Sequence, residues 1–238
     1  MFPGPMRFLS SIILLLLFSL SSLTVFSQEQ NDTHERVYGY DPLLYNGRVY
    51  YFYPQPGTGG TQYLLDAFDT HGTITLRGVT YTNLTINYDI YNQLLVLKYK
   101  NAIGSASLIE ISEAWLEKFD LEGRHFEILT GNDTTKRIYQ VVGKGNDKIL
   151  YFREKQMLLH NLEVSGLYYF SKVIKEMYVL SGKRLVKFSN NRSFIAAFSP
   201  SEKELIKKYL RKNNLNVKKA NDFKMNELIN YCNTLGGS

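Results

Sequence analysis

Residues 73–90 read TITLRGVTYTNLTINYDI, and this stretch decides the fold class. Apolar side chains alternate with polar ones at Ile74 and Leu76, and again from Leu84 to Ile90, with Gly78 between the two runs. Alternation with a period of two places one face of a strand on a core and the other face in water. The stretch therefore predicts two strands, each with one buried face.

Further strands are expected on both sides of this stretch, separated by short turns. The predicted strands are 49–53, 94–99, 107–111, 114–121, 126–129, 138–142, 149–152, 167–170, 177–180, 185–188 and 194–198. A short helix is the alternative for 114–121, and a loop or short helix is expected at 157–166. Residues 143–147 are typical of a hairpin turn. Because no spacing of the strand–helix–strand type appears, the predicted fold class is mainly β (α+β), with a curved antiparallel sheet or a partly open barrel.

The period changes near the C-terminus. Ser199, Pro200 and Glu202 are typical of a helix start, and a second start lies at Asn221-Asp222. Both predicted helices are amphipathic and need an apolar surface, which the sheet supplies. The expected organisation is a signal peptide at 1–27, a loose lead-in at 28–48, a β domain at 49–198 and a helical pair at 199–238 packed on it.

The first 27 residues read as a secretory signal peptide. Arg7 precedes a run without charged residues, and Val25-Phe26-Ser27 suits a cut before Gln28. A retained membrane anchor is the rival interpretation, but serines crowd the ends of the run and no basic cluster follows. Because no cysteine lies near the cut, lipidation is not expected. We expect a soluble periplasmic or extracellular protein without an integral membrane span.

The single cysteine, Cys232, cannot form an internal disulfide, so packing must stabilise the fold. The formal net charge is +6, and the stretch from Ser201 onward contains eight lysines and arginines against four acids. Such an ending suits an acidic membrane surface or an acidic envelope protein. A solvated helix face is the other interpretation. Nucleic acid is not expected as a partner in this compartment.

No catalytic, cofactor or metal signature is present. The glycine-rich residues 56–61 lack the Gly-Lys-Ser/Thr ending of a phosphate loop. The four histidines show no ligand spacing, and each is expected at the surface or at a sheet edge. No Ser or Cys lies in a Gly-x-Ser-x-Gly context. For Asp89, an exposed or a turn-stabilising role is expected. We therefore expect no catalytic residue, no cofactor and no metal.

Tyrosine is the unusual residue, with 18 in the chain. It offers a large contact area with a polar tip, which suits binding surfaces, although it is also an ordinary strand residue. Together with the basic helix, the tyrosines define a candidate binding surface. Its members are Tyr50, Tyr51, Tyr53, Tyr88, Tyr91, Lys207, Lys208, Arg211 and Lys212.

Two segments carry a resemblance. Residues 84–90, with Tyr88-Asp89-Ile90 followed by the apolar strand at 94–97, resemble a signature of uncharacterised secreted proteins of the Bacteroidota type. The basic helix at 203–212, the linker with Lys218-Lys219 and the ending at 228–235 are similar to the same group. The resemblance implies a periplasmic or cell-surface location and assigns no activity.

Three functions are compatible with these residues. The first is a non-catalytic exported envelope protein that binds an envelope partner or has a structural role. The alternative is a carrier or sensor of a lipid-like ligand in a β cavity. A hydrolase of glycans or peptides would need acids or histidines such as Asp66, Asp69, Asp89, His71 and His125 to converge in a cleft.

Overall fold

The computed structural model describes residues 40–101, 103–131, 133–159 and 168–236. The chain divides into two units, residues 1–45 and 46–238. In the described end of the first unit, the Tyr45 backbone N–H donates to the Asp41 carbonyl at 2.9 Å. The signal peptide predicted at 1–27 lies outside the described residues, as does most of the predicted lead-in.

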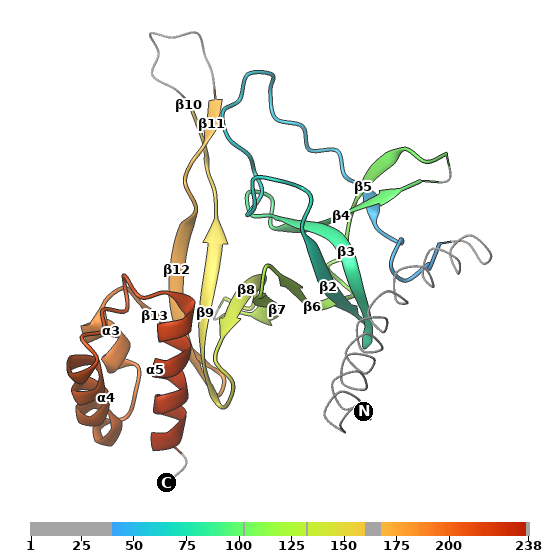
Figure 1. Cartoon of the computed structure of the whole chain (residues 1–238). Helices are drawn as coiled ribbons and strands as arrows, with labels where there is room; N and C mark the ends of the chain where they lie inside the picture. Colours follow the sequence, from blue (N-terminus) through green and yellow to red (C-terminus); the bar gives the residue numbers. More distant parts are fainter. Residues whose placement is uncertain (1–39, 102, 132, 160–167, 237–238) are drawn as a thin grey trace, which may run out of the picture. The chain divides into compact units, whose positions relative to one another are not determined.

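The second unit is built on one antiparallel sheet of eleven strands (Figure 1). In spatial order these are β1 (Arg48–Val49), β5 (Ala106–Glu110), β4 (Leu94–Lys100), β3 (Val79–Asp89), β2 (His71–Leu76), β6 (Leu116–Leu121), β7 (Arg124–Thr130), β8 (Lys136–Val142), β9 (Asp147–Glu154), β12 (Ile174–Ser181) and β13 (Arg184–Phe188). The sheet is open, with β1 and β13 as its edges. The predicted mainly β, antiparallel fold is confirmed, including a strand at the end of 114–121.

Tight turns set the register of neighbouring strands. Arg77 and Gly78 both adopt positive φ, 46° and 79°, between β2 and β3. Glu122 and Gly123 do the same between β6 and β7, with φ of 52° and 68°. Two such residues make the two-residue hairpin turn whose twist matches that of the flanking strands.

The strands β9 and β12 continue into a second, two-stranded ladder of β10 (Met157–Leu159) and β11 (Tyr168–Phe170). The expectation of a loop or short helix at 157–166 is therefore wrong for its first three residues, because Met157 pairs across to Phe170 and holds the chain extended. The rest of that segment, 160–166, lies outside the described residues.

Two predicted strands are corrected. Of 49–53, only Val49 joins a strand, and the next residues run beside β5, where the Tyr50 N–H donates to the Leu108 carbonyl at 3.0 Å. The predicted strand 194–198 is instead the second half of the helix α3 (Asn191–Ala196) and the turn that follows it. Asn190 and Ser193 form a reciprocal capping box, and this cap overrides the β preference of the phenylalanines.

The C-terminal helices pack on the β8–β9–β12–β13 end of the sheet, as Figure 1 shows. Besides α3, they are α4 (Pro200–Lys212) and α5 (Asp222–Leu235). The Glu202 carboxylate accepts from the Ser199 N–H at 2.9 Å, which confirms the predicted helix start. Phe194, Ile206, Val217, Met225, Leu228, Ile229 and Cys232 are buried in one core with Ile149, Tyr151 and Val179 of the sheet. The predicted packing of the helical pair on the sheet is confirmed.

Candidate functional site

The structure divides the predicted tyrosine surface into buried and exposed members. Tyr50 and Tyr88 are 1% and 0% exposed, so neither belongs to a binding surface. Tyr51 and Tyr53 are 74% and 75% exposed. Because the segment is extended, successive side chains point to opposite sides. Tyr51 and Tyr53 therefore lie on the side opposite to the buried Tyr50. Tyr91 is half-buried.

Tyr50 is part of a buried polar network around Asp89. Its hydroxyl donates to Asp89 Oδ2 at 2.6 Å and accepts from Gln62 Nε2 at 3.1 Å. Asp89 Oδ1 accepts the backbone N–H groups of Tyr91 and Asn92 at 3.0 and 2.9 Å. Burial and the bond to Asp89 raise the pKa of Tyr50. Asp89 thus stabilises the turn after β3, one of the two roles expected for it, and it is fully buried.

Phe52, which lies between the two exposed tyrosines in the sequence, belongs to a cluster of aromatic rings. The Phe52 ring lies 5.4 Å from that of Tyr91, and Tyr91 lies 5.4 Å from Phe170 of β11. Tyr91 therefore joins the 50–53 segment to the β10–β11 ladder.

The predicted basic residues of α4 separate into two groups. Lys207 and Arg211, one helical turn apart, line a hollow of about 270 Å³ between α3 and α4. Lys208 and Lys212 lie outside its lining. The Lys207 ammonium also pairs with Glu204 at 3.3 Å, between two exposed side chains.

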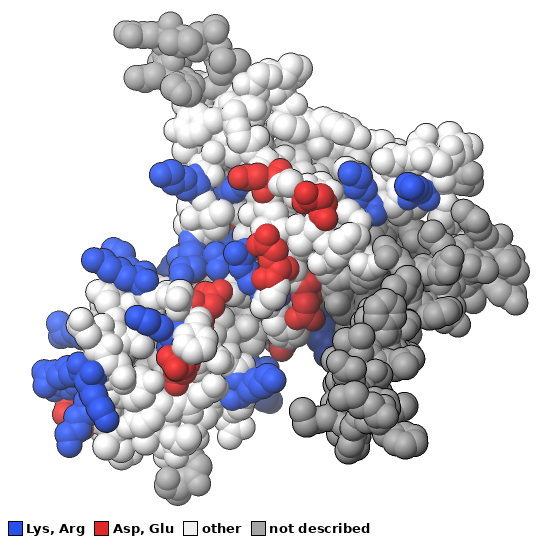
Figure 2. Space-filling model, viewed as in Figure 1, with Lys and Arg blue, Asp and Glu red and all other residues white. Residues whose placement is uncertain are grey.

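A second hollow, of about 280 Å³, adjoins the first through Asn214 and Leu215. It continues along the linker, where Lys219 lines it, to the first turn of α5, where Lys224 lines it. None of the described residues that line either hollow is acidic. We call the two together the basic groove. Figure 2 shows lysine and arginine side chains gathered over α4 on this side of the molecule.

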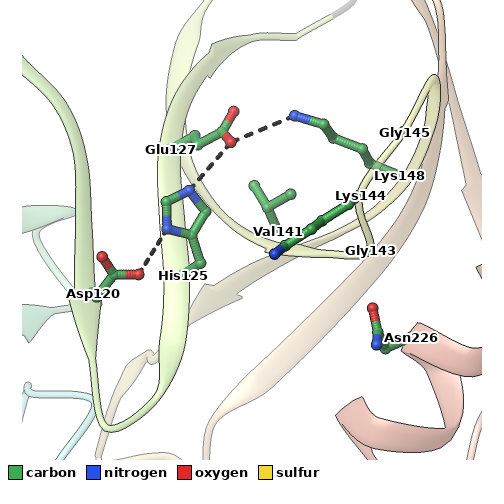
Figure 3. Close-up of a pocket in the computed structure, with 9 residues that line it drawn as sticks. All are labelled: Asp120, His125, Glu127, Val141, Gly143, Lys144, Gly145, Lys148 and Asn226. Atoms are coloured by element: carbon green, nitrogen blue, oxygen red, sulfur yellow. Dashed lines mark hydrogen bonds and ion pairs between the residues drawn. The ribbon is translucent and has the colours of Figure 1, made fainter. Parts of the chain in front are cut away.

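A third hollow lies elsewhere, between the β6–β9 strands and α5, with a volume of about 640 Å³ (Figure 3). Asp120 Oδ1 lies 2.7 Å from His125 Nδ1, and Glu127 Oε1 lies 3.2 Å from His125 Nε2. The Lys148 ammonium lies 3.5 Å from the same Glu127 oxygen, and Lys144 extends into the hollow from the hairpin loop. The two carboxylates thus hold the imidazole from opposite sides.

The sequence did not predict the cluster of His125 with Asp120 and Glu127. His125 is expected at the surface or at a sheet edge; its side chain is 35% exposed and so lies at the surface, although β7 is an inner strand of the sheet. The turn at Glu122-Gly123 puts Asp120 directly opposite His125. Glu127, two residues on, shares the same face. The alternation of charges in 123–127 was the available signal, but the register was needed to interpret it.

The lining in Figure 3 combines two carboxylates, one histidine and two lysines. Among its described residues there is no Ser, Thr or Cys to act as a nucleophile, and both carboxylates already contact the histidine. Across the described part of the chain, no group of three or more His, Cys, Asp or Glu is arranged to hold a metal ion.

Among the described residues, no hydrogen bond or ion pair joins any two of the groups proposed for a hydrolase, which are Asp66, Asp69, Asp89, His71 and His125. Asp89 faces Tyr50, His71 Nδ1 lies 3.4 Å from the Asn83 carbonyl, and His125 contacts Asp120 and Glu127 instead.

No protein-family model, curated protein or solved structure matches this chain. The resemblance to secreted Bacteroidota proteins therefore stays a prediction. Among helices in the described ranges, none combines the length and apolarity needed to cross a bilayer.

Proposed function

We propose that this chain is a non-catalytic, exported envelope protein that binds an acidic segment of a partner protein through the basic groove. The observation that carries this proposal is the composition of the groove. Lys207, Arg211, Lys219 and Lys224 line it, without a carboxylate among its described lining residues.

The spacing of the cations suits an extended acidic segment. Lys207 and Arg211 are four residues apart on α4, so their side chains share a face about 6 Å apart. Alternate side chains of an extended chain repeat at about 6.6 Å. A partner with an acid at every second position would therefore meet both cations. The groove also has an apolar floor that includes Leu210 and Leu215, which are buried.

Tyr51 and Tyr53 offer a second contact surface for the same partner. Both are about three-quarters exposed, and Phe52 between them lies with its ring 5.4 Å from that of Tyr91. Fixed aromatic side chains with polar tips contribute contact area at low entropic cost.

The proposal is tested with a glutamate-rich peptide as the probe. Replacing Lys207→Glu and Arg211→Glu together should weaken peptide binding about tenfold, because two attractive contacts become repulsive. The matched control is Lys98→Glu with Lys118→Glu, which makes the same charge change on exposed strand positions. Fluorescence anisotropy at low and physiological salt measures both, and the difference should shrink as salt screens the charges.

Equal binding by the two charge-reversed proteins would show that net charge, and not the groove, attracts the peptide. A second experiment tests location by crosslinking in intact envelopes. The wild-type protein should be recovered together with a partner, whereas the Lys207→Glu, Arg211→Glu variant should be recovered alone. Recovery of the wild type as a free monomer, or binding of anionic vesicles in preference to the peptide, would contradict the proposal.

A further inference from the structure

The sheet face that meets α5 carries two cations at directly opposite positions. Arg153 on β9 and Lys175 on β12 are cross-strand partners, and both side chains are half-buried. Like charges directly opposite on one face destabilise a sheet. Burial lowers the pKa of each group, and the charge of Arg153 lowers that of Lys175 further. The position therefore concentrates positive charge where it is costly.

The charge of Asp222, the first residue of α5, acts on both cations and raises their pKa values. Its carboxylate accepts from Gln140 Nε2 at 2.6 Å. The Gln140 Oε1 atom in turn accepts from Arg153 Nε at 2.8 Å. Within the described residues, no ion pair joins Arg153 or Lys175 to a carboxylate. Figure 2 shows a group of lysine and arginine side chains where β9 and β12 pass the start of α5.

A buried hydroxyl without a partner lies in the same place. Tyr151 is 1% exposed, and in the described chain its hydroxyl is the one buried side-chain polar atom without a hydrogen-bond partner. The Lys175 ammonium lies 4.5 Å from the centre of its ring, and the Arg153 guanidinium carbon lies 5.7 Å from it. Burial and the charge of Asp222 raise the pKa of this hydroxyl, and the charge of Arg153 lowers it.

We propose that Tyr151, Arg153 and Lys175 form a binding site for a phosphate group at the N-terminus of α5. None of these three residues lines the basic groove, although the groove also reaches the first turn of α5. The ligand of the site is either free phosphate or a phosphate group on a larger molecule.

The chemistry of the donors favours phosphate. Arginine presents a planar fork of N–H groups, lysine presents a compact charge and the phenol presents one O–H donor, so several oxygens of a tetrahedral anion can be bound at once. A phosphate group also has more acceptor oxygens to share between two adjacent cations than a carboxylate has. The positive end of the α5 helix dipole favours an anion here, although the Lys224 N–H of its first turn already donates to Asn221 Oδ1 at 3.0 Å.

Titration calorimetry of the full protein with inorganic phosphate, in a chloride buffer, tests the site. Tyr151→Phe removes the hydroxyl and keeps the ring, and Lys175→Gln removes one charge. Each should raise the Kd for phosphate about tenfold, as expected for the loss of one hydrogen bond to a charged group. The control, Lys98→Gln, makes the same charge change at an exposed strand position and should leave the Kd unchanged.

Thermal unfolding separates a binding role from a structural one. Without phosphate, Tyr151→Phe should keep or raise the Tm, because it removes a buried hydroxyl that has no partner. With phosphate, the wild type should gain more in Tm than this variant. The Lys207→Glu, Arg211→Glu protein should bind phosphate like the wild type, so failure of the groove proposal would leave this one standing.

Three results would overturn the inference. They are a wild-type Kd weaker than about 10 mM, equal phosphate affinity of the wild type and Tyr151→Phe, and binding of acetate as tight as that of phosphate.

Discussion

Replacing Asp89→Asn should strongly destabilise the protein, because this carboxylate is fully buried and accepts four hydrogen bonds. The new amide keeps one acceptor for the backbone N–H groups of Tyr91 and Asn92. Its NH₂ group, however, replaces the oxygen that now accepts from the Tyr50 hydroxyl at 2.6 Å and from Asn92 Nδ2 at 2.8 Å. Two bonds to a charged acceptor are lost, each contributing about 1.5–3 kcal/mol.

The Tyr50 hydroxyl can rotate to accept from the new amide, so part of the loss is recovered. We therefore expect the free energy of unfolding to fall by about 3 kcal/mol. Urea denaturation followed by circular dichroism should show the midpoint falling by about 1–2 M with an unchanged m-value. The control is Asp69→Asn, the same chemical change at an exposed carboxylate, which should stay within about 0.5 kcal/mol of the wild type.

A double-mutant cycle with Tyr50→Phe isolates the Tyr50–Asp89 bond. The two changes should be non-additive, because the second removes an interaction that the first has already broken. A cost for Asp89→Asn below about 1 kcal/mol, or full additivity, would refute the assignment of Asp89 as a buried turn acceptor.

Three further predictions concern the helical core and the sheet. Phe194→Ala should lower the free energy of unfolding by about 3–5 kcal/mol in denaturant titrations, since the side chain is fully buried, whereas Phe223→Ala, at a position 68% exposed, should change it little. Burial raises the pKa of Cys232 to about 12. The thiol should therefore react with a disulfide reagent at neutral pH only when the protein unfolds. Fast labelling of the folded protein would contradict the burial of this thiol. The Lys187 ammonium bonds to Glu176 and lowers the pKa of that carboxyl. The pair should therefore contribute fully to stability above the ordinary glutamate pKa, and this contribution should be lost as pH falls through the lowered pKa. NMR titration of Lys187→Met should show the Glu176 pKa rising.

Local pattern alone was enough for the fold class. The alternation in 73–90 predicted β2 and β3 because burial of one strand face depends on a period of two that is visible in the sequence. The start of α4 was also predictable, because Ser199, Pro200 and Glu202 satisfy the helix end within a few residues. Export remains a prediction, because the segment that carries it lies outside the described residues.

The candidate sites depended on tertiary structure, because they join residues that are distant in sequence. A period of two in the sequence is compatible with burial of either Tyr50 or Tyr51. The way in which this segment runs beside β5 decides that Tyr50 is the buried one. The pairing of Arg153 with Lys175 depends on strand register, since a shift by one residue would turn either side chain to the other face. The periodicity of the sequence determines that a strand has one buried face. The turns and the packing of the strands determine which charged side chains lie together on one face of the sheet.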